Sequence, residues 1–181
     1  MIYLLLADGF EEVEALSPLD LLRRAGKDVL TVSITNERAV RGAHGITVLA
    51  DLTTEELTCP CDEMLILPGG MPGTRNLDAS PVTDRLLDEV LMHGGHVAAI
   101  CAAPLILGKR GLLRGKRATC YPGFEEELLG AACVSAPFVT DGKITTATGA
   151  GAAVPFGGEL VRVLCGEETS EALLRSFRYL L

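Results

Sequence analysis

The chain has 181 residues, enough for one domain with a substantial core, and its 48% hydrophobic content excludes a disordered protein. The net charge of −8 comes without any stretch dense in lysine or arginine, which argues against specific nucleic-acid binding. No apolar run approaches the ~20 residues that a membrane helix needs. We therefore expect a single domain over residues 1–181, with neither nucleic acid nor a membrane as its partner.

The apolar start of the chain, Met1 to Leu6, predicts a first strand rather than a secretion signal. It is short, it has no basic residues before it, and it runs directly into Asp8. A cytoplasmic protein is expected on these grounds. The six cysteines of such a protein are expected to stay reduced.

Short apolar runs alternate with helical patterns along the chain. In chain order we expect a strand at 2–7, a helix at 11–25, a strand at 28–34, a hairpin at 39–49, a strand at 63–67, a helix at 81–93, a strand at 96–100, a short helix from 102, a strand at 116–120, a helical turn at 124–129, paired strands at 134–140 and 143–148, and helices at 151–165 and 169–179. Continuous apolar strands between helices indicate an α/β protein, a mostly parallel sheet covered on both faces.

In sheets of this kind, ligands bind beyond the carboxyl ends of the strands. That edge is expected to carry the loops at 8–14, 68–73, 101–104, 120–123 and 148–152. Most of these loops are rich in glycine, proline or small residues. The candidate site residues are therefore sought there.

Cys101 follows a predicted strand that ends at Ile100, and a helix is expected almost immediately after it. A nucleophile on such a turn is exposed above the sheet, and a helix N-terminus favours the thiolate form of a cysteine. The backbone N–H of Ala102, and that of Gly70 on the neighbouring loop, are candidate donors to a developing oxyanion. The alternative is a small buried structural cysteine, the usual fate of a free cysteine.

The three histidines, His44, His93 and His96, all precede Cys101 in the chain. A glutamine amidotransferase would need a histidine and a carboxylate downstream of its cysteine, and this chain has no such histidine. We expect His93 and His96 to be surface residues that form no metal site, because a third ligand is missing. His44 lies in the predicted hairpin and reaches a site only through a contact made by the fold or by a subunit.

Glu14 is the most informative carboxylate of the acidic segment at 11–14. Pro18 and Leu21 follow it at helical spacing, so Glu14 borders the apolar stripe and is expected to point inward. A buried carboxyl has a raised pKa, stays protonated and can donate to a thiolate or move a proton. The alternative is a partly exposed helix glutamate, and helix capping is sufficient to explain Glu11 and Glu12.

At these residues the sequence resembles the ThiJ/PfpI family, in the branch of the Parkinson-disease-associated deglycase and its bacterial relatives. The resemblance covers nearly the whole chain. It rests on five segments: Asp-Gly-Phe-Glu-Glu-Val-Glu at 8–14, Leu-Arg-Arg-Ala-Gly at 22–26, Ile-Leu-Pro-Gly-Gly at 66–70, Ala-Ala-Ile-Cys-Ala-Ala-Pro at 98–104 and Thr-Ala-Thr-Gly-Ala-Gly at 146–151.

The resemblance implies a flavodoxin-like three-layer sandwich, similar to class I glutamine amidotransferases, and a homodimer. It implies that Cys101 is the reactive cysteine and that Glu14 is the protonated glutamate that hydrogen-bonds it. Gly70 and Ala102 match the backbone donors. The expected substrate-pocket residues are Gly69, Tyr121, Gly149 and His44, with no cofactor and no metal.

Three positions depart from the family pattern. Tyr121 precedes Pro122 where many members have a histidine, so a histidine base is missing. His44 stands where a relative has an arginine, and Ala150 replaces a proline between two glycines. The sequence alone therefore does not determine the charge of the pocket.

Three functions compete. The first is a glyoxalase- or deglycase-type enzyme acting on α-oxoaldehydes such as methylglyoxal, or on their adducts, in protection against oxidative and carbonyl stress. The second is a redox-sensing, chaperone-like protein in which Cys101 oxidises to a sulfinate. The third is a thiol peptidase or a protein of thiazole phosphate synthesis, as relatives are labelled. We rank them in that order, because the peptidase lacks a base.

Overall fold

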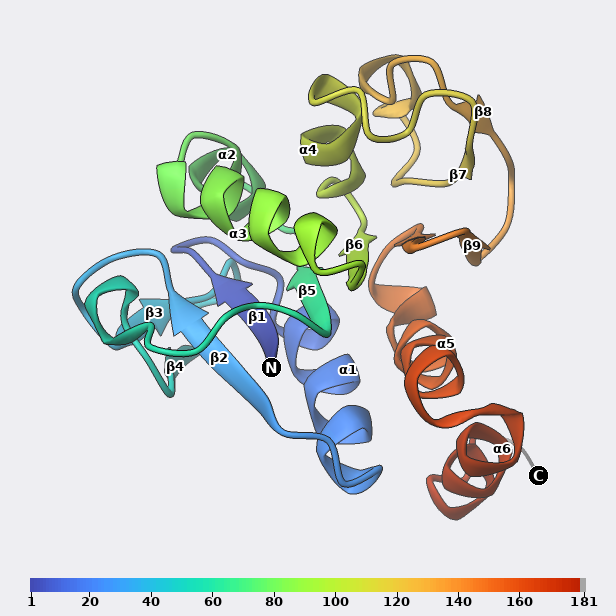
Figure 1. The fold of residues 1–181 in the computed structure, drawn as a ribbon, viewed down its shortest axis with the longest axis horizontal. Coiled ribbons are helices and arrows are strands. Elements are labelled where there is room, and N and C mark those ends of the chain that lie inside the picture. Colours follow the sequence, from blue (N-terminus) through green and yellow to red (C-terminus); the bar gives the residue numbers. More distant parts are fainter. Residues whose placement is uncertain (180–181) are drawn as a thin grey trace.

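The computed structural model describes residues 1–179. A central sheet of six strands crosses the molecule, and Figure 1 shows its arrangement. The strand order is β2-β1-β5-β6-β10-β9. Five strands run parallel, and β9 pairs antiparallel to β10 at one edge. The bounds of the strands are β1 Ile2–Leu6, β2 Val29–Ser33, β5 Met64–Leu67, β6 His96–Ile100, β9 Phe138–Asp141 and β10 Ile144–Ala147.

Helices cover both faces of the sheet (Figure 1). One face packs against α1 (Glu12–Arg24) and α5 (Ala153–Cys165), with α6 (Glu167–Ser176) lying on α5. The other face packs against α2 (Gly73–Asp78), α3 (Pro81–Met92) and α4 (Pro104–Lys109). This arrangement confirms the predicted three-layer sandwich with a mostly parallel sheet.

Strand β1 shows why the apolar runs are continuous. Ile2, Leu4 and Leu6 join the cluster formed with α1 and α5, whereas Tyr3 and Leu5 join the cluster on the opposite face. Successive side chains of a strand point to opposite faces, so a strand covered on both sides must be apolar at every position.

Smaller elements lie outside the central sheet. The predicted hairpin is confirmed as β3 (Ala39–Arg41) and β4 (Thr47–Leu49), which pair antiparallel. Strands β7 (Arg117–Ala118) and β8 (Ala132–Cys133) form a parallel pair of their own. Three short 3-10 helices complete the fold: η1 Thr54–Glu56, η2 Glu125–Glu127 and η3 Ala150–Ala152.

Several sequence expectations about the fold differ from the structure. Helix α2 was not expected, because its glycine, threonine and asparagine are weak helix formers. The strand expected from residue 134 begins only at Phe138. His96 is buried, with 7% of its surface exposed, because its strand lies in the middle of the sheet under two helix layers; the prediction of a surface histidine is wrong there.

The loops at the carboxyl ends of the strands meet, as expected for this fold. The loop after β1 bonds the loop after β5, since the N–H of Glu11 donates to the carbonyl of Gly69 at 2.9 Å. The loop after β6 is tied to the end of β10, where the N–H of Cys101 donates to Ala147 at 2.8 Å. Across residues 1–179, none of the helices combines the length and the apolar character that crossing a membrane demands.

Candidate active site

Cys101 occupies a strained turn directly after β6. Its φ of 65° places a residue with a side chain in the left-handed region, which otherwise favours glycine. The backbone on both sides is held, because the N–H of Cys101 donates to Ala147 and its carbonyl accepts from Tyr121 at 2.8 Å. A turn of this kind between a strand and a helix presents a nucleophile above the sheet edge.

Glu14 lies in the first turn of α1 and is 1% exposed, which confirms that it points inward. Its Oε2 accepts a hydrogen bond from the backbone N–H of Gly69 at 3.1 Å. Glu11 caps the helix, since its carboxylate accepts from the N–H of Glu14 at 2.8 Å. The cap fixes the first turn of the helix and with it the direction of the Glu14 side chain.

Gly69 separates Glu14 from Cys101. A β-carbon at position 69 would lie 2.4 Å from Oε2 of Glu14 and 2.5 Å from Cβ of Cys101. Real β-carbons do not approach other atoms so closely, so only glycine allows the carboxyl and the cysteine to meet here. The next residue, Gly70, has a φ of 91° and packs against the backbone of the loop after β1.

The pKa of Glu14 is raised to about 7, with burial as the main cause. Interaction with Cys101 and with the backbone of Gly69 and Ala150 opposes this rise. The carboxyl is therefore present in both protonation states near neutral pH. This is the range in which a side chain accepts and returns protons most effectively.

The pKa of the Cys101 thiol is raised to about 12, first by burial and then by the negative charge of Glu14. The backbone N–H groups of Gly70 and Ala102 oppose the rise. The direction is opposite to the thiolate expected from the sequence, because α4 begins only at Pro104 and the partly exposed Cys101 is largely shielded from water beside the Glu14 carboxylate. Where Glu14 is ionised, the pair holds one proton, which lies on the thiol, and the thiolate forms when Glu14 takes that proton.

A hollow of about 620 Å³ opens next to this pair. Its lining includes Tyr121, Pro122, Pro137, Thr148 and the segment 149–152. A β-carbon at Gly149 would lie 3.3 Å from the Tyr121 ring and 3.7 Å from Oε1 of Glu14. The predicted pocket residues Tyr121 and Gly149 therefore border the hollow on the side where Glu14 lies.

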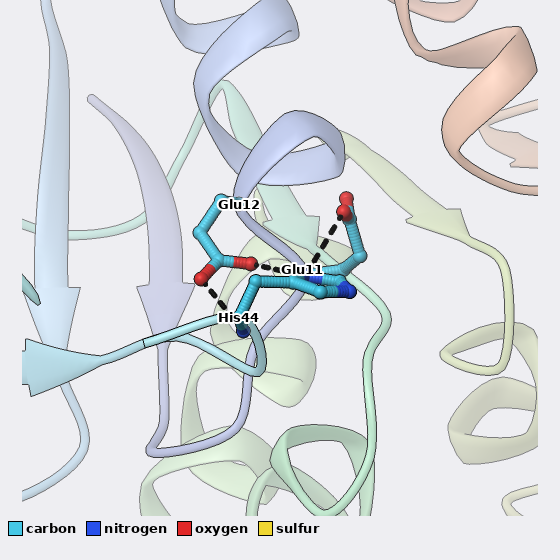
Figure 2. Close-up of side chains that lie close together, drawn as sticks. All are labelled: Glu11, Glu12 and His44. Carbon is cyan, nitrogen blue, oxygen red and sulfur yellow. Dashed lines mark hydrogen bonds and ion pairs between the residues drawn. The ribbon is translucent and has the colours of Figure 1, made fainter. Parts of the chain in front are cut away.

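His44 lies on the loop between β3 and β4, where it pairs with Glu12 (Figure 2). Its Nδ1 is 2.9 Å from Oε2 of Glu12, and the N–H groups of His44 and Ile46 donate to Oε1. Glu12 is thus buried, and it holds this loop against α1. The sequence predicts only helix capping for Glu12. His44 does not line the hollow of the described chain, so the structure does not bring it to the other predicted pocket residues.

Glu11, Glu12 and His44 also place metal-ligating atoms within 4.8 Å of one another. Both carboxylates already accept hydrogen bonds from backbone N–H groups, and the ring of His44 satisfies the remaining oxygen of Glu12. These contacts explain the arrangement without an ion.

The other histidines lie away from Cys101. His93 follows α3 and its Nδ1 contacts the carbonyl of Glu89 at 2.8 Å. His96 starts the strand that ends just before Cys101, so it lies at the opposite edge of the sheet. Within residues 1–179, no histidine hydrogen-bonds the cysteine, in agreement with the sequence, in which no histidine follows Cys101.

Comparison with known proteins shows the family of the chain. The profile of the DJ-1/PfpI family matches residues 1–163. The chain belongs to the DJ-1/PfpI family. This confirms the family that the sequence motifs predicted, and the central cysteine turn and Glu14 both lie inside the matched range.

Relatives in the DJ-1/PfpI family include a plant protein and two named enzymes. DJ-1 homolog B of Arabidopsis thaliana is 40% identical over 164 residues, which cover 90% of this chain and 37% of the plant protein. A deglycase of Pyrococcus abyssi is 34% identical, covering 90% of this chain and 98% of the relative. A glutathione-independent glyoxalase of Caenorhabditis elegans is 30% identical, and the match covers 95% of this chain and 92% of the relative. The chain spans about two fifths of the length of the two Arabidopsis relatives it matches.

Solved structures of DJ-1/PfpI proteins share the whole fold. A DJ-1 superfamily protein of Salmonella typhimurium superposes with a TM-score of 0.92 at 32% identity, covering 99% of this chain and 98% of the other. DJ-1 of Toxoplasma gondii in an oxidised form gives a TM-score of 0.92 at 31% identity, with the same coverage. The flavodoxin-like sandwich expected from the resemblance is thereby confirmed.

Proposed function

We propose that the protein is a cysteine-dependent enzyme of the glyoxalase or deglycase type, acting on α-oxoaldehydes such as methylglyoxal or on their adducts. The observation that carries the proposal is the buried contact between Glu14 and Cys101, in which the pKa of the carboxyl is raised to about 7. Relatives named deglycase and glutathione-independent glyoxalase support the same reaction class.

The reaction begins with addition of Cys101 to the aldehyde. The Glu14 carboxylate accepts the thiol proton, and the sulfur forms a bond to the aldehyde carbon. The backbone N–H groups of Gly70 and Ala102 face the sulfur and are placed to stabilise the oxyanion that develops beside it. Glu14 then returns its proton to that oxygen, which gives a hemithioacetal.

Proton movement between the two carbons completes the conversion. The Glu14 carboxylate removes the hydrogen of the former aldehyde carbon, and the electron pair moves to the adjacent carbonyl oxygen as an enediolate. Glu14 delivers the proton to the second carbon, and the first carbon becomes a thioester. Water hydrolyses the thioester to an α-hydroxy acid and restores the thiol, so the overall change is addition of one water without a redox partner.

The test is conversion of methylglyoxal to lactate by the wild type and three variants. Glu14→Gln is expected to lower kcat by at least about 10²-fold, the usual contribution of a general acid–base, and Cys101→Ser by at least as much, because it removes the nucleophile. Cys165→Ser is the control, since that cysteine is also partly exposed but lies at the end of α5. Absence of turnover by the wild type, or full activity of Cys101→Ser, overturns the proposal.

A second candidate is a redox sensor, and the partial exposure of Cys101 favours it. A Toxoplasma relative has been solved in an oxidised form. With peroxide as the oxidant, the sulfur takes up two oxygens to become a sulfinate, which Glu14 in its acid form and the N–H groups of Gly70 and Ala102 would stabilise. Mass spectrometry after mild peroxide tests this candidate, and a Cys101 that stays reduced while exposed cysteines oxidise contradicts it.

A further inference from the structure

The hollow beside Glu14 has a lining without charge. It is built from Tyr121, Pro122, Pro137, the small polar residues Ser135 and Thr148, and the glycine and alanine segment 149–152. None of these lining side chains is acidic or basic. The hollow is open to solvent, and an ionised group entering it would gain no oppositely charged partner, whereas an apolar group would cover apolar surface.

Tyr121 supplies the aromatic wall of the hollow. Half of its surface is exposed (50%), although its backbone N–H is fixed to the carbonyl of Cys101 at 2.8 Å. Its ring lies against Gly149, which in turn lies against the Glu14 carboxyl. The ring is therefore held close to the reacting groups while one part of it stays free to contact a substrate.

The size of the hollow exceeds what a three-carbon aldehyde needs. Its volume of about 620 Å³ falls in the range of roughly 300–1,000 Å³ that accommodates drug-sized ligands. Methylglyoxal leaves most of that space to water. A planar apolar substituent on the substrate would occupy more of that space and could stack on the ring of Tyr121.

We propose that this hollow selects α-oxoaldehydes that carry an uncharged aryl group, with Tyr121 as the residue that determines the preference. The inference rests on the proposed function and specifies its substrate class. An aryl group gains contact with Tyr121 and the two prolines, whereas a carboxylate on the same ring finds no cation among the lining residues.

The experiment compares initial rates with phenylglyoxal, 4-carboxyphenylglyoxal and methylglyoxal as substrates. For the wild type we expect the carboxylated compound to have a kcat/KM about tenfold below that of phenylglyoxal. Tyr121→Ala is expected to lower kcat/KM about tenfold more for phenylglyoxal than for methylglyoxal, mainly through KM, because a stacking contact of this kind is worth up to about 1.5 kcal/mol.

Two further variants separate the aromatic contact from other effects. Tyr121→Phe keeps the ring and is expected to retain the preference, which excludes a requirement for the hydroxyl. Tyr179→Ala is the matched control, since that tyrosine is 48% exposed but lies beyond α6.

The failures of the two proposals are distinguishable. No turnover of any of the three aldehydes overturns the proposed function itself. Turnover with equal kcat/KM for phenylglyoxal and its carboxylated form, or equal losses for phenylglyoxal and methylglyoxal in Tyr121→Ala, overturns only the aryl selectivity.

Discussion

Glu14 and Cys101 face each other across Gly69, whose N–H donates to the Glu14 carboxylate at 3.1 Å. The two residues come from the first helix and from the turn after the fourth strand of the sheet along the chain, so the sheet order creates their contact. Strand β5 lies between β1 and β6, and its terminal loop therefore lies between the two side chains. The missing side chain at position 69 is what allows the contact.

Replacing Gly69 by alanine tests this relationship. The new methyl group would meet Oε2 of Glu14 at 2.4 Å and Cβ of Cys101 at 2.5 Å, so one of the two side chains must move. We expect aldehyde turnover to fall at least tenfold and the free energy of unfolding to fall by about 1–3 kcal/mol, the usual cost of overpacking. Thermal melts and methylglyoxal kinetics measure both effects.

The folding control for this variant is Gly151→Ala. A β-carbon at position 151 has no atom within 4 Å and its φ is not in the left-handed region, so the melting temperature should stay within about 1 °C of the wild type. A Gly69→Ala protein with unchanged activity would contradict the close contact between Glu14 and Cys101.

The sheet and the cysteine turn could be predicted from the sequence because each depends on local patterns. Continuous apolar runs predict the parallel strands. The turn at Cys101 is predicted because few residues separate the end of the strand from the start of the next helix. Glu14 was found because Pro18 and Leu21 place it on the apolar side of its helix. Predicting these features requires only the spacing of apolar residues along a helix and the alternation of side chains between the two faces of a strand.

Features that depend on contacts between distant segments could not be predicted in the same way. The anchoring of the hairpin loop by Glu12 requires the packing of β3 and β4 against α1, which no local pattern reveals. The buried state of His96 follows from the central place of β6 in the strand order. The high pKa of the Cys101 thiol likewise depends on its own burial and on the negative charge of Glu14, which distant segments bring beside it.

Backbone strain at Cys101 predicts that glycine is more stable than alanine at this position, the reverse of the usual order. With φ at 65°, any residue with a β-carbon is disfavoured by roughly 1–2 kcal/mol. We expect Cys101→Gly to be more stable than Cys101→Ala by about 1 kcal/mol in denaturant titrations. At Cys120, which is buried without a positive φ, the order should be reversed by about 0.5–1 kcal/mol. The same order at both positions would contradict strain at Cys101.

The raised pKa of Glu14 makes stability depend on pH. Its pKa rises from the usual 4.5 to about 7 on folding, so the folded state holds this proton more tightly than the unfolded state. The contribution is complete below pH 4.5 and is lost as the pH rises through 7, with a total of about 3 kcal/mol at 1.4 kcal/mol per pKa unit. Glu14→Gln should remove this slope, and a variant with the same slope as the wild type would contradict the burial of an ionisable Glu14.

His96 should produce a slope of the opposite sign. Its Nε2 has no hydrogen-bond partner among residues 1–179, and its pKa is lowered from 6.5 to about 4. Burial is the main cause, Lys143 and Arg162 add to it, and Glu159 opposes it. The unfolded chain therefore binds a proton that the folded chain rejects, and stability is lost as the pH falls from 6.5 to 4, again by about 3 kcal/mol.

The slopes of Glu14 and His96 offset each other between pH 4.5 and 6.5 in the wild type. His96→Gln should therefore uncover the Glu14 slope, with stability falling as the pH rises, whereas Glu14→Gln should uncover the His96 slope, with stability falling as the pH drops. Chemical denaturation of the two variants at half-unit pH steps measures both. Identical pH profiles for the two variants would show that neither side chain is held in the protonation state that its burial dictates.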